Sequence, residues 1–411
     1  MERVAITGMG VISPLGNTVD RFWNRLVRGE SGISLIDTFD ASRYKAKIAG
    51  LVRDFDADER FGRKEARRMD RFCQFAMAAA EQAWEDSGIS LDRINKERIA
   101  VYVGSGVGGI QTLFEQAVTI QERGPERVSP LLVPMMISNM AAACISMKYG
   151  ALGPTLSPVT ACSIGNTAIG EASRLIRLGL ADVVIAGGTE AAVTQLACAG
   201  FGNATALSTR NDEPSRASRP FDANRDGFVM AEGAGILIME SFSHAMKRDA
   251  RMYAEVIGYG ATSDAYHMVA THPEGDGAYR AMKLAMEEAG IGTDEVDVIS
   301  AHATSTEIGD KSETLAIKRL FGQQAYCIPI TANKSMIGHM LGASSAVEAI
   351  ALVKTLQENI IPPTINQEQK DPDCDLDVVP NEARQAPLTI GISNSFGFGG
   401  HNAVIALKSL V

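Results

Sequence analysis

The chain has 411 residues, of which 45% are hydrophobic and 21% are charged, as in an ordinary globular protein. Its 39 Lys and Arg residues against 49 Asp and Glu residues give a net charge of −10, which repels phosphate polyanions and argues against nucleic acid as the main ligand. No stretch reaches the roughly 18 consecutive apolar residues of a membrane span, and the first residues do not have the pattern of an export signal. Six cysteines without a CxxC pair are typical of free thiols in a reducing compartment, so we expect a cytoplasmic protein.

Apolar, strand-like runs alternate with amphipathic segments of helical spacing along the chain. We expect strands at residues 4–8, 101–106, 183–188, 254–260, 296–303 and 389–395. The segments that predict helices include 79–89, 164–176 and 281–291. Because no Pro/Gly/Ser-rich linker interrupts this alternation, it predicts a mixed α/β protein with one compact body.

The sequence is internally repeated. Three pairs of segments are alike and occur in the same order: 4–10 and 256–260, 79–89 and 281–291, and 162–172 and 339–349. The last pair aligns without gaps and places Cys162 and His339 at equivalent positions. We therefore expect two related halves, residues 1–250 and 251–411, whose equivalent helix N-termini meet at one site.

Cys162 is the one cysteine with a motif around it. It stands at a small-residue turn between an apolar stretch and the helical segment 164–176. Unpaired N–H groups and the helix dipole at such a turn favour the thiolate, the form that attacks carbonyls and thioesters. The alternative, a small buried hydrophobic residue, is our interpretation of the other five: Cys73, Cys144, Cys198, Cys327 and Cys374.

Two histidines stand in turns with polar or small neighbours. His302 follows an apolar run and precedes hydroxyl residues, and His339 lies in the segment NKSMIGHMLGA. Neither has metal-ligand spacing to another His or Cys. Each is a candidate acid, base or hydrogen-bond donor, with a structural histidine as the alternative.

The segment 392–402 interleaves two phenylalanines with three glycines: Phe396, Gly397, Phe398, Gly399 and Gly400. Such a loop can bring backbone N–H groups to a ligand oxygen and present aromatic rings to a pocket. A plain flexible turn is the alternative, but two phenylalanines are costly to leave in water. We therefore expect an ordered, functional loop.

Two further motifs lack the spacing of ligand sites. The segment 222–227 opens like a calcium-binding loop, but Gly233 stands at the twelfth position, where a bidentate Glu is required. The glycines of residues 104–109 lack the Rossmann spacing. We therefore expect no metal site and no nucleotide cofactor.

Four separated motifs together resemble one family, and the similarity extends along the whole chain. They are TAC ending at Cys162, AHATST around His302, NKSMIGHMLGA around His339 and NSFGFGGHN around Phe398. In these motifs the chain resembles the elongating type II β-ketoacyl-acyl carrier protein synthases of bacterial fatty acid synthesis. The resemblance implies a thiolase-like α/β fold, in which two βαβαβαββ halves stack as five layers, α-β-α-β-α, and a homodimer.

The resemblance also implies the chemistry. Cys162 accepts an acyl chain from the phosphopantetheine thioester of an acyl carrier protein, and His302 and His339 promote the decarboxylation of malonyl-carrier protein. The N–H groups of Cys162 and Phe398 form an oxyanion hole. No resident cofactor is implied, because the phosphopantetheine arrives on the carrier protein.

Further residues receive roles by the same resemblance. A charged network behind the histidines, with ordinary surface charge as the alternative, consists of Lys334, Asp310, Glu313 and Glu348. Thr304 and Thr306 hold the pantetheine arm. The acyl pocket is lined or gated by Val107, Leu132, Phe201, Leu341, Phe396 and Phe398. The basic patch that docks the carrier protein, with a merely solvated helix face as the alternative, is Lys64, Arg67 and Arg68.

Departures from the family pattern keep two other hypotheses open. Val107 is smaller than the Ile of many relatives, which widens the pocket by about one methylene. Thr205 and Glu126 replace residues that are often basic at the docking surface, which favours a ketosynthase of a specialised polyketide or other acyl pathway with a dedicated carrier protein. A non-catalytic partner subunit that sets chain length is disfavoured, because Cys162 and both histidines are present.

Overall fold

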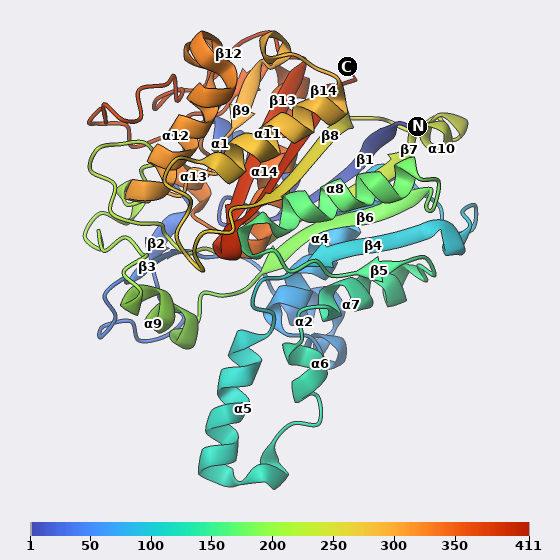
Figure 1. Ribbon diagram of the computed structural model, residues 1–411. Coiled ribbons are helices and arrows are strands. Elements are labelled where there is room, and N and C mark those ends of the chain that lie inside the picture. The colour runs from blue at the N-terminus through green and yellow to red at the C-terminus, as the bar shows by residue number, and fades with distance from the viewer. Residues whose placement is uncertain (1, 411) are drawn as a thin grey trace.

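Ten strands form one mixed sheet in the computed structural model, which describes residues 2–410 (Figure 1). The strand order is β10-β9-β13-β14-β8-β1-β7-β6-β4-β5. In chain order the strands are β1 (Val4–Ile12), β4 (Ile99–Gly104), β5 (Thr155–Leu156), β6 (Val183–Glu190), β7 (Gly233–Ser241), β8 (Ala254–Ser263), β9 (Val298–Ser300), β10 (Ile330–Thr331), β13 (Ile390–Gly397) and β14 (His401–Ser409). All six strands expected from the sequence are present, and β5, β7, β10 and β14 were not predicted.

The two halves of the sheet have the same topology. Outward from the centre, β1-β7-β6-β4-β5 and β8-β14-β13-β9-β10 pair in the same sense, first antiparallel twice and then parallel twice. The halves join where Ala5 and Ile6 of β1 pair antiparallel with β8. The duplicated architecture predicted from the sequence is therefore confirmed.

Helices form three further layers around the two halves of the sheet. The outer face of the first half is covered by α4 (Arg71–Ser87) and α7 (Met140–Tyr149), and that of the second by α11 (Asp276–Ala289), with α12 (Glu307–Phe321) packed against it. The remaining pair, α8 (Ile164–Arg177) and α14 (Ser344–Glu358), contacts strands of both halves and lies between them. The layer order is α-β-α-β-α, as expected.

The shorter elements lie in the connections. They are α1 (Val19–Val27), β2 (Ile33–Leu35), β3 (Ile48–Gly50), α2 (Ala57–Phe61), α3 (Arg63–Ala66), η1 (Lys96–Arg98), η3 (Ala161–Ser163), α9 (Gln195–Asn203), η4 (Pro214–Arg216), α10 (Phe242–Lys247), η5 (Thr293–Glu295), η6 (Gly322–Tyr326), α13 (Lys334–Ile337), η7 (Leu341–Ala343), β11 (Ile360–Ile361), β12 (Arg384–Gln385) and η8 (Phe398–Gly400). Within residues 2–410, no helix is both long enough and apolar enough to cross a membrane.

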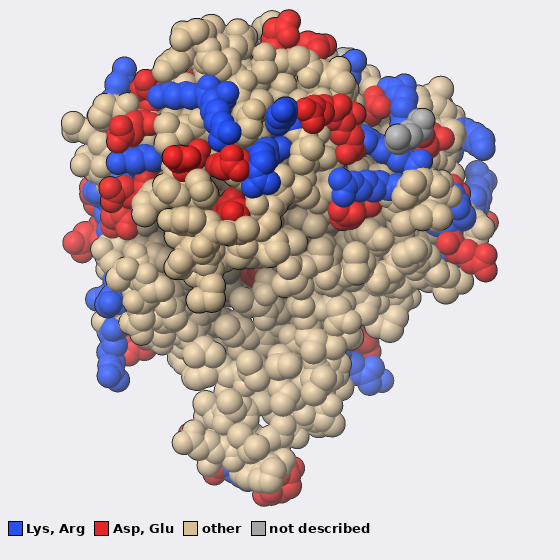
Figure 2. All heavy atoms as spheres, viewed as in Figure 1, with Lys and Arg blue, Asp and Glu red and all other residues tan. Residues whose placement is uncertain are grey.

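An arm projects from the body between β4 and β5 (Figure 1). It contains α5 (Ile110–Arg123), the turn η2 (Pro125–Arg127) and α6 (Leu132–Met136). Large apolar side chains on it are exposed, among them Ile120 at 49% and Val133 at 59%. Figure 2 shows almost no charged residue on this side between the tip of the arm and the upper part of the body. Exposed apolar side chains on a surface with so few charges are typical of an interaction site.

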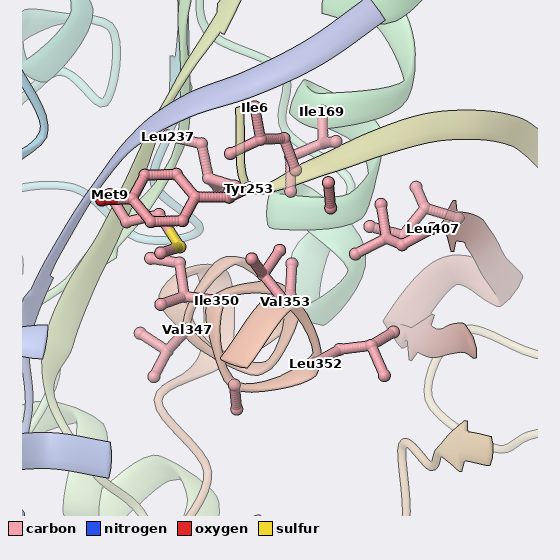
Figure 3. Packing of buried hydrophobic residues seen from close by; sticks show 14 of the residues in the cluster. Ile6, Met9, Ile169, Leu237, Tyr253, Val347, Ile350, Leu352, Val353 and Leu407 are labelled. Carbon is pink, nitrogen blue, oxygen red and sulfur yellow. The ribbon is translucent and has the colours of Figure 1, made fainter. Parts of the chain in front are cut away.

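The central layer is fixed by a large apolar cluster. Figure 3 shows Val347, Ile350 and Val353 of α14 beside Ile6 of β1 and Leu237 of β7. All five side chains have no exposed surface. Burial of such side chains stabilises the fold by about 1.5–3 kcal/mol each before the entropy of ordering them is subtracted.

The two central helices meet at Gly165 with no side chain between them. A Cβ atom at this position would lie 2.2 Å from the backbone nitrogen of Ala346 and 2.7 Å from the hydroxyl oxygen of Ser345. Beside this contact, the N–H of Asn166 donates to the Ser345 hydroxyl at 3.1 Å. The start of α8 is therefore held directly against the start of α14.

The register between the halves differs from the prediction by three residues. The turns η3 and η7 each open with a residue in the left-handed region, Ala161 at φ 51° and Leu341 at φ 46°, and each leads directly into its central helix. Cys162 is therefore equivalent to Gly342, and the predicted equivalence of Cys162 with His339 is wrong. Small residues recur at helical spacing in both segments, so the sequences also match when slipped by about one turn.

The Gly165 contact leads to a stability prediction. We expect Gly165→Ala to lower the free energy of unfolding by about 1–3 kcal/mol, because the added methyl group has no space between the helices. The matched control is Gly200→Ala in α9, where a Cβ atom meets nothing within 4 Å and the higher helix propensity of Ala should stabilise by up to about 1 kcal/mol. Urea denaturation of both variants measures the difference, and equal stabilities would contradict the proposed close contact.

Candidate active site

One cavity of about 550 Å³ collects residues from both halves of the chain. Cys162 reaches it from the turn before α8, His302 from the end of β9 and His339 from the segment before η7. The other predicted site residues that line it are Val107, Phe201, Thr304, Thr306, Leu341, Phe396 and Phe398. Motifs that are far apart in the sequence thus meet at one site.

Cys162 sits in a turn held from two sides. Ala161 before it adopts the left-handed conformation at φ 51°, which costs an alanine about 1–2 kcal/mol. The carbonyl oxygen of Cys162 accepts a hydrogen bond from the hydroxyl of Ser395 in β13 at 3.0 Å and a longer one from that of Ser345 in α14 at 3.4 Å. These contacts fix the main chain while the side chain lines the cavity.

Burial dominates the ionisation of the thiol. Cys162 is only 7% exposed, and burial raises its pKa to about 12, against a lowering by Lys334. The backbone N–H groups of Phe398 and Cys162 point at the sulfur and also lower the pKa, by less than burial raises it. Our expectation of a resting thiolate at the helix start is therefore wrong, because these N–H groups do not compensate for the hydration that a thiolate would lose in the buried site.

The two histidines face each other in the cavity. Their ring centroids are 5.6 Å apart at an interplanar angle of 85°. The main-chain N–H of His302 donates to a Glu313 oxygen at 2.9 Å, and Nδ1 of His339 lies 2.9 Å from the hydroxyl of Ser344. Burial, and after it the positive charge of Lys334, lowers the pKa of both imidazoles well below the usual value, so both are neutral near pH 7.

Four charged side chains behind the histidines are buried and are not surface charges: Lys334, Asp310, Glu313 and Glu348, each at most 2% exposed. The Lys334 ammonium binds Glu348 at 2.6 Å, and Glu313 also accepts from the Asn394 amide at 3.0 Å. Burial raises the pKa of Glu348 to about 7, with Lys334 opposing the shift.

Asp310 holds the loop after His302 and does not contact the imidazole through a hydrogen bond. Its carboxylate accepts from the N–H groups of Phe221 at 2.8 Å and Ser305 at 3.1 Å, and it lies 3.5 Å from Arg225. Burial raises the pKa of Asp310 to about 7. The same loop carries Thr304 and Thr306, whose hydroxyl oxygens are 3.0 Å apart.

The backbone of the phenylalanine loop is held by a hydrogen bond, while the ring of Phe398 is partly exposed at the cavity edge. Phe398 is 40% exposed, and its ring centroid lies 6.2 Å from that of Phe201. The next residue, Gly399, has φ 81° and donates its N–H to the Met268 carbonyl at 2.7 Å. Phe396 instead packs its ring against His302, with the centroids 5.5 Å apart.

Leu132 and the basic residues lie outside the cavity. Leu132 is partly buried on α6 of the arm, so a single chain does not bring it to the acyl pocket. Lys64, Arg67 and Arg68 are exposed on α3 and just after it, and Arg68 lies 3.3 Å from Glu65. The patch is accessible to a partner.

Glu190 is a cavity residue that the sequence reasoning missed. It ends β6, has no exposed surface and accepts hydrogen bonds from two different turns. The signal that could have found it is a carboxylate two residues after the predicted strand at 183–188, since ionisable residues at a buried strand end are seldom accidental.

Among residues 2–410, no three His, Cys, Asp or Glu side chains are arranged to hold a metal ion. In the segment that resembles a calcium loop, Asp222 instead accepts from the Arg219 guanidinium at 3.0 Å. The carboxylate thus has a structural partner.

The raised thiol pKa gives a pH prediction. In the free protein, we expect the rate of Cys162 alkylation by iodoacetamide to rise about tenfold per unit from about pH 7 to about pH 10, because the reactive thiolate is a small fraction over that whole range. Peptide mass spectrometry separates Cys162 from the exposed Cys327. A plateau near pH 7 would show that the helix start does produce a resting thiolate.

Comparison with known proteins agrees along the whole chain. The family model described as Beta-ketoacyl synthase, N-terminal domain, matches residues 1–245, and that of the C-terminal domain matches residues 253–368. The 3-oxoacyl-[acyl-carrier-protein] synthase 2 of Synechocystis sp. is 48% identical over 407 residues, covering 99% of this chain and 98% of that protein. The protein of the same name from Staphylococcus aureus strain COL is 47% identical over the same shares.

Solved structures of ketosynthases share the fold. A type II PKS acyl-carrier protein in complex with its ketosynthase, AntDE:AntF, matches at TM-score 0.93 and 35% identity, and the ishigamide ketosynthase/chain length factor at 0.92 and 37%. A beta-ketoacyl synthase from Burkholderia phymatum matches at 0.93 and 34%. Each match covers 100% of both chains. With two family models matching most of its length and full-length relatives near half identity, this chain belongs to the beta-ketoacyl synthase family.

Proposed function

We propose that this protein condenses malonyl-acyl carrier protein with an acyl chain bound to Cys162, releasing CO₂ and giving 3-oxoacyl-acyl carrier protein in cytoplasmic fatty acid elongation. The observation that carries the proposal is the meeting of Cys162, His302 and His339 in one cavity of a chain 48% identical to a 3-oxoacyl-[acyl-carrier-protein] synthase 2. We keep residues 1–250 and 251–411 as its two halves.

The first step is transfer of the acyl chain to Cys162. The sulfur attacks the thioester carbonyl, the new S–C bond forms, and the pantetheine sulfur leaves with a proton. Because burial keeps the thiol protonated at rest, its proton has to leave as the thioester arrives, and the neutral imidazoles in the same cavity are available bases. The N–H groups of Cys162 and Phe398 point at the sulfur, where they can also stabilise the carbonyl oxyanion.

The second step is decarboxylation and C–C bond formation. Neutral His302 and His339 can each donate an N–H to the malonyl thioester oxygen and stabilise the enolate that forms as CO₂ departs. The carbanion then attacks the acyl-Cys162 carbonyl, and the cysteine sulfur leaves. Lys334, which is paired with Glu348, helps to keep both imidazoles neutral, and Glu313 holds the main chain of His302; we assign all three as positioning residues.

The pantetheine arm and the acyl chain occupy different parts of the cavity. Thr304 and Thr306 present hydroxyl groups to the polar arm, while Phe201, Leu341 and Phe398 give an apolar wall for the acyl chain. Val107 and Phe396 complete this lining. The enzyme needs no cofactor of its own under this proposal, because the carrier protein brings the phosphopantetheine.

The carrier protein is the proposed macromolecular partner. Lys64, Arg67 and Arg68 form an exposed basic patch on a chain whose net charge is −10. A local patch of this sign steers an acidic partner and fixes its orientation. The AntDE:AntF structure gives a ketosynthase of this fold held by an acyl carrier protein.

We also propose a homodimer through the apolar arm. Leu113, Ile120 and Val133 on the arm are more than 40% exposed, as are Met147 and Val159 near its base. Val107 at the cavity wall is itself 38% exposed and adjoins α6, since Gly109 packs on Met135. A second copy on this face would cover Val107, and its Leu132 could then reach the pocket that a single chain leaves open.

A specialised polyketide or acyl pathway is the second candidate function. It is favoured by Thr205, which lines the cavity at an exposed position where relatives are often basic. It is also favoured by the full-length similarity to a type II PKS ketosynthase and to the ishigamide ketosynthase/chain length factor. The identity to those ketosynthases, 35% and 37%, is lower than the 48% to the fatty acid enzyme. We therefore place fatty acid elongation first.

The catalytic proposal predicts loss of activity in Cys162→Ala. We expect 3-oxoacyl product from malonyl-carrier and acyl-carrier proteins to fall at least about a thousandfold, because no other group lies where the acyl chain must bind. Mass spectrometry of the products and of the acylated Cys162 peptide measures this, with Cys327→Ala, an exposed cysteine outside the cavity, as control. Appreciable elongation by Cys162→Ala would contradict the mechanism, and turnover with only a non-fatty-acid carrier would favour the specialised pathway.

The docking proposal predicts a charge effect on KM. We expect Lys64→Glu combined with Arg67→Glu to raise KM for acyl-carrier protein about tenfold, with little change in the rate for an acyl-pantetheine substrate lacking the carrier. Arg93→Glu is the matched control, because Arg93 is an exposed cation beyond the other end of α4. Equal effects of the two charge reversals, or an equal loss with acyl-pantetheine, would argue that the patch does not dock the carrier.

A further inference from the structure

The carboxylate of Glu190 joins two adjoining turns of the cavity wall. Oε1 accepts from the hydroxyl of Ser105 at 2.7 Å and from the N–H of Val107 at 3.2 Å. Oε2 accepts from the N–H of Gly106 at 2.9 Å and from the N–H of Gly342 at 3.1 Å. Three donors belong to the loop after β4 and one to η7, so one side chain ties both together.

The Glu190 carboxylate lies too close to the backbone of both turns for a side chain at Gly106 or Gly342. A Cβ atom on Gly106 would lie 2.8 Å from Oε2, and one on Gly342 would lie 2.9 Å from it. The hydroxyl of Ser105 also accepts from the N–H of Gly108 at 3.1 Å, which extends the bonding around the loop. The two glycines are therefore at positions where the carboxylate must approach the backbone closely.

The environment is unusual for a charge. Glu190 has no exposed surface, and all four of its donors are uncharged N–H or O–H groups. An acidic side chain buried without a cation costs several kcal/mol unless its hydrogen bonds are complete. Burial raises the pKa of Glu190, and the four hydrogen bonds act against that rise. An apolar side chain at this strand end would leave the N–H groups of Gly106, Val107 and Gly342 without an acceptor.

Each of the two turns contributes an apolar residue to the cavity lining. Val107 belongs to the first turn, and Leu341 opens the second at φ 46°. Gly342 is the position equivalent to Cys162 in the other half, so its N–H corresponds to that of the nucleophile. Where Cys162 offers this N–H to the reacting group, Gly342 offers it to Glu190.

We propose that Glu190 is a positioning residue that sets the width of the acyl pocket by holding the Val107 turn at a fixed distance from the Leu341 turn. What enters that pocket, an acyl chain on a carrier protein, rests on the proposed function. Glu190 acts through Val107 and Leu341 and does not itself react. Its loss changes which chain lengths reach Cys162 more than it changes the reactivity of the sulfur.

The test uses alkylating probes that need the pocket but not the catalytic reaction. Cys162 is treated with iodoacetamide and with N-alkyl iodoacetamides of increasing chain length, and the rate at Cys162 is followed by peptide mass spectrometry. The ratio of the long-chain rate to the iodoacetamide rate reports the pocket. Any change in thiol ionisation caused by removing the nearby charge affects every reagent alike and cancels in the ratio.

In Glu190→Gln, an amide nitrogen replaces an oxygen that accepts from backbone N–H groups, so the two turns lose their fixed spacing and Val107 and Leu341 no longer pack closely on an alkyl chain. We expect the long-to-short ratio to fall about tenfold or more, and elongation products to shift in length by the same change of preference. Glu240→Gln is the matched control, because Glu240 is equally buried and lies opposite Val183, at the other end of β6 from Glu190. It should leave the ratio unchanged even where it lowers stability.

Ser105→Ala removes one donor to Glu190 and covers the case in which Glu190→Gln does not fold. We expect a smaller fall of the ratio in the same direction. The proposal would be overturned if the ratio of the long-chain rate to the iodoacetamide rate were unchanged in either folded variant, or fell no further than in Glu240→Gln. It would also be overturned if alkylation of the wild-type protein did not depend on chain length. If the wild-type protein shows the alkyl-length dependence but elongates no acyl-carrier substrate, the pocket role of Glu190 stands and the proposed function fails.

Discussion

The contact between α8 and α14 at Gly165 is the constraint on which the site depends. Because no side chain separates the helices there, the turns that open them, η3 and η7, are held at one fixed separation. Cys162 belongs to one turn and Leu341 to the other, and His339 lies two residues before the second. Strands of both halves pack on this helix pair, so the cavity forms only where the halves meet. Neither half contains a complete set of the reacting groups.

The duplicated turns η3 and η7 have similar backbone conformations, but the N–H group that follows the left-handed residue has a different partner in each. Ala161 and Leu341 adopt the same strained conformation, and an N–H follows each at an equivalent place. In one half this N–H belongs to Cys162 and points at its own sulfur, whereas in the other it belongs to Gly342 and is occupied by Glu190. A helix start favours a negative group in both cases. In one half the acceptor is the buried carboxyl group of Glu190, and in the other it is the sulfur of Cys162.

Periodicity and motifs were sufficient for the architecture and for the residues that meet. The six predicted strands were found because apolar runs report buried strands directly. The strands β7 and β14 were not predicted from the same evidence, although each is nearly or fully buried. The three-residue slip between the halves arose because glycine and alanine match each other in either register, and only the left-handed residues before each helix distinguish the two.

The properties that the sequence could not predict depend on how the folded chain buries its side chains. The thiol of Cys162 was expected to ionise easily from its helix position, but the extent to which the cavity excludes water is a property of the assembled wall. No sequence motif marks Glu190, because the groups that donate hydrogen bonds to it are more than 80 residues before it and 152 residues after it. Leu132 was assigned to the pocket by resemblance, and a single chain places it on the arm.

Burial also indicates how the site can use a charged substrate. The thiol and both imidazoles are shifted towards their neutral forms, and Lys334 is paired with Glu348. Arg225 is the one Lys or Arg among the described residues that line the cavity, and it is bonded to Asp371 at 2.7 Å. A malonyl carboxylate would therefore enter without an unpaired lysine or arginine in the lining to neutralise it. Loss of CO₂ moves its charge to the thioester oxygen, where neutral imidazoles can donate. A site that disfavours the carboxylate and stabilises the enolate therefore lowers the barrier to decarboxylation.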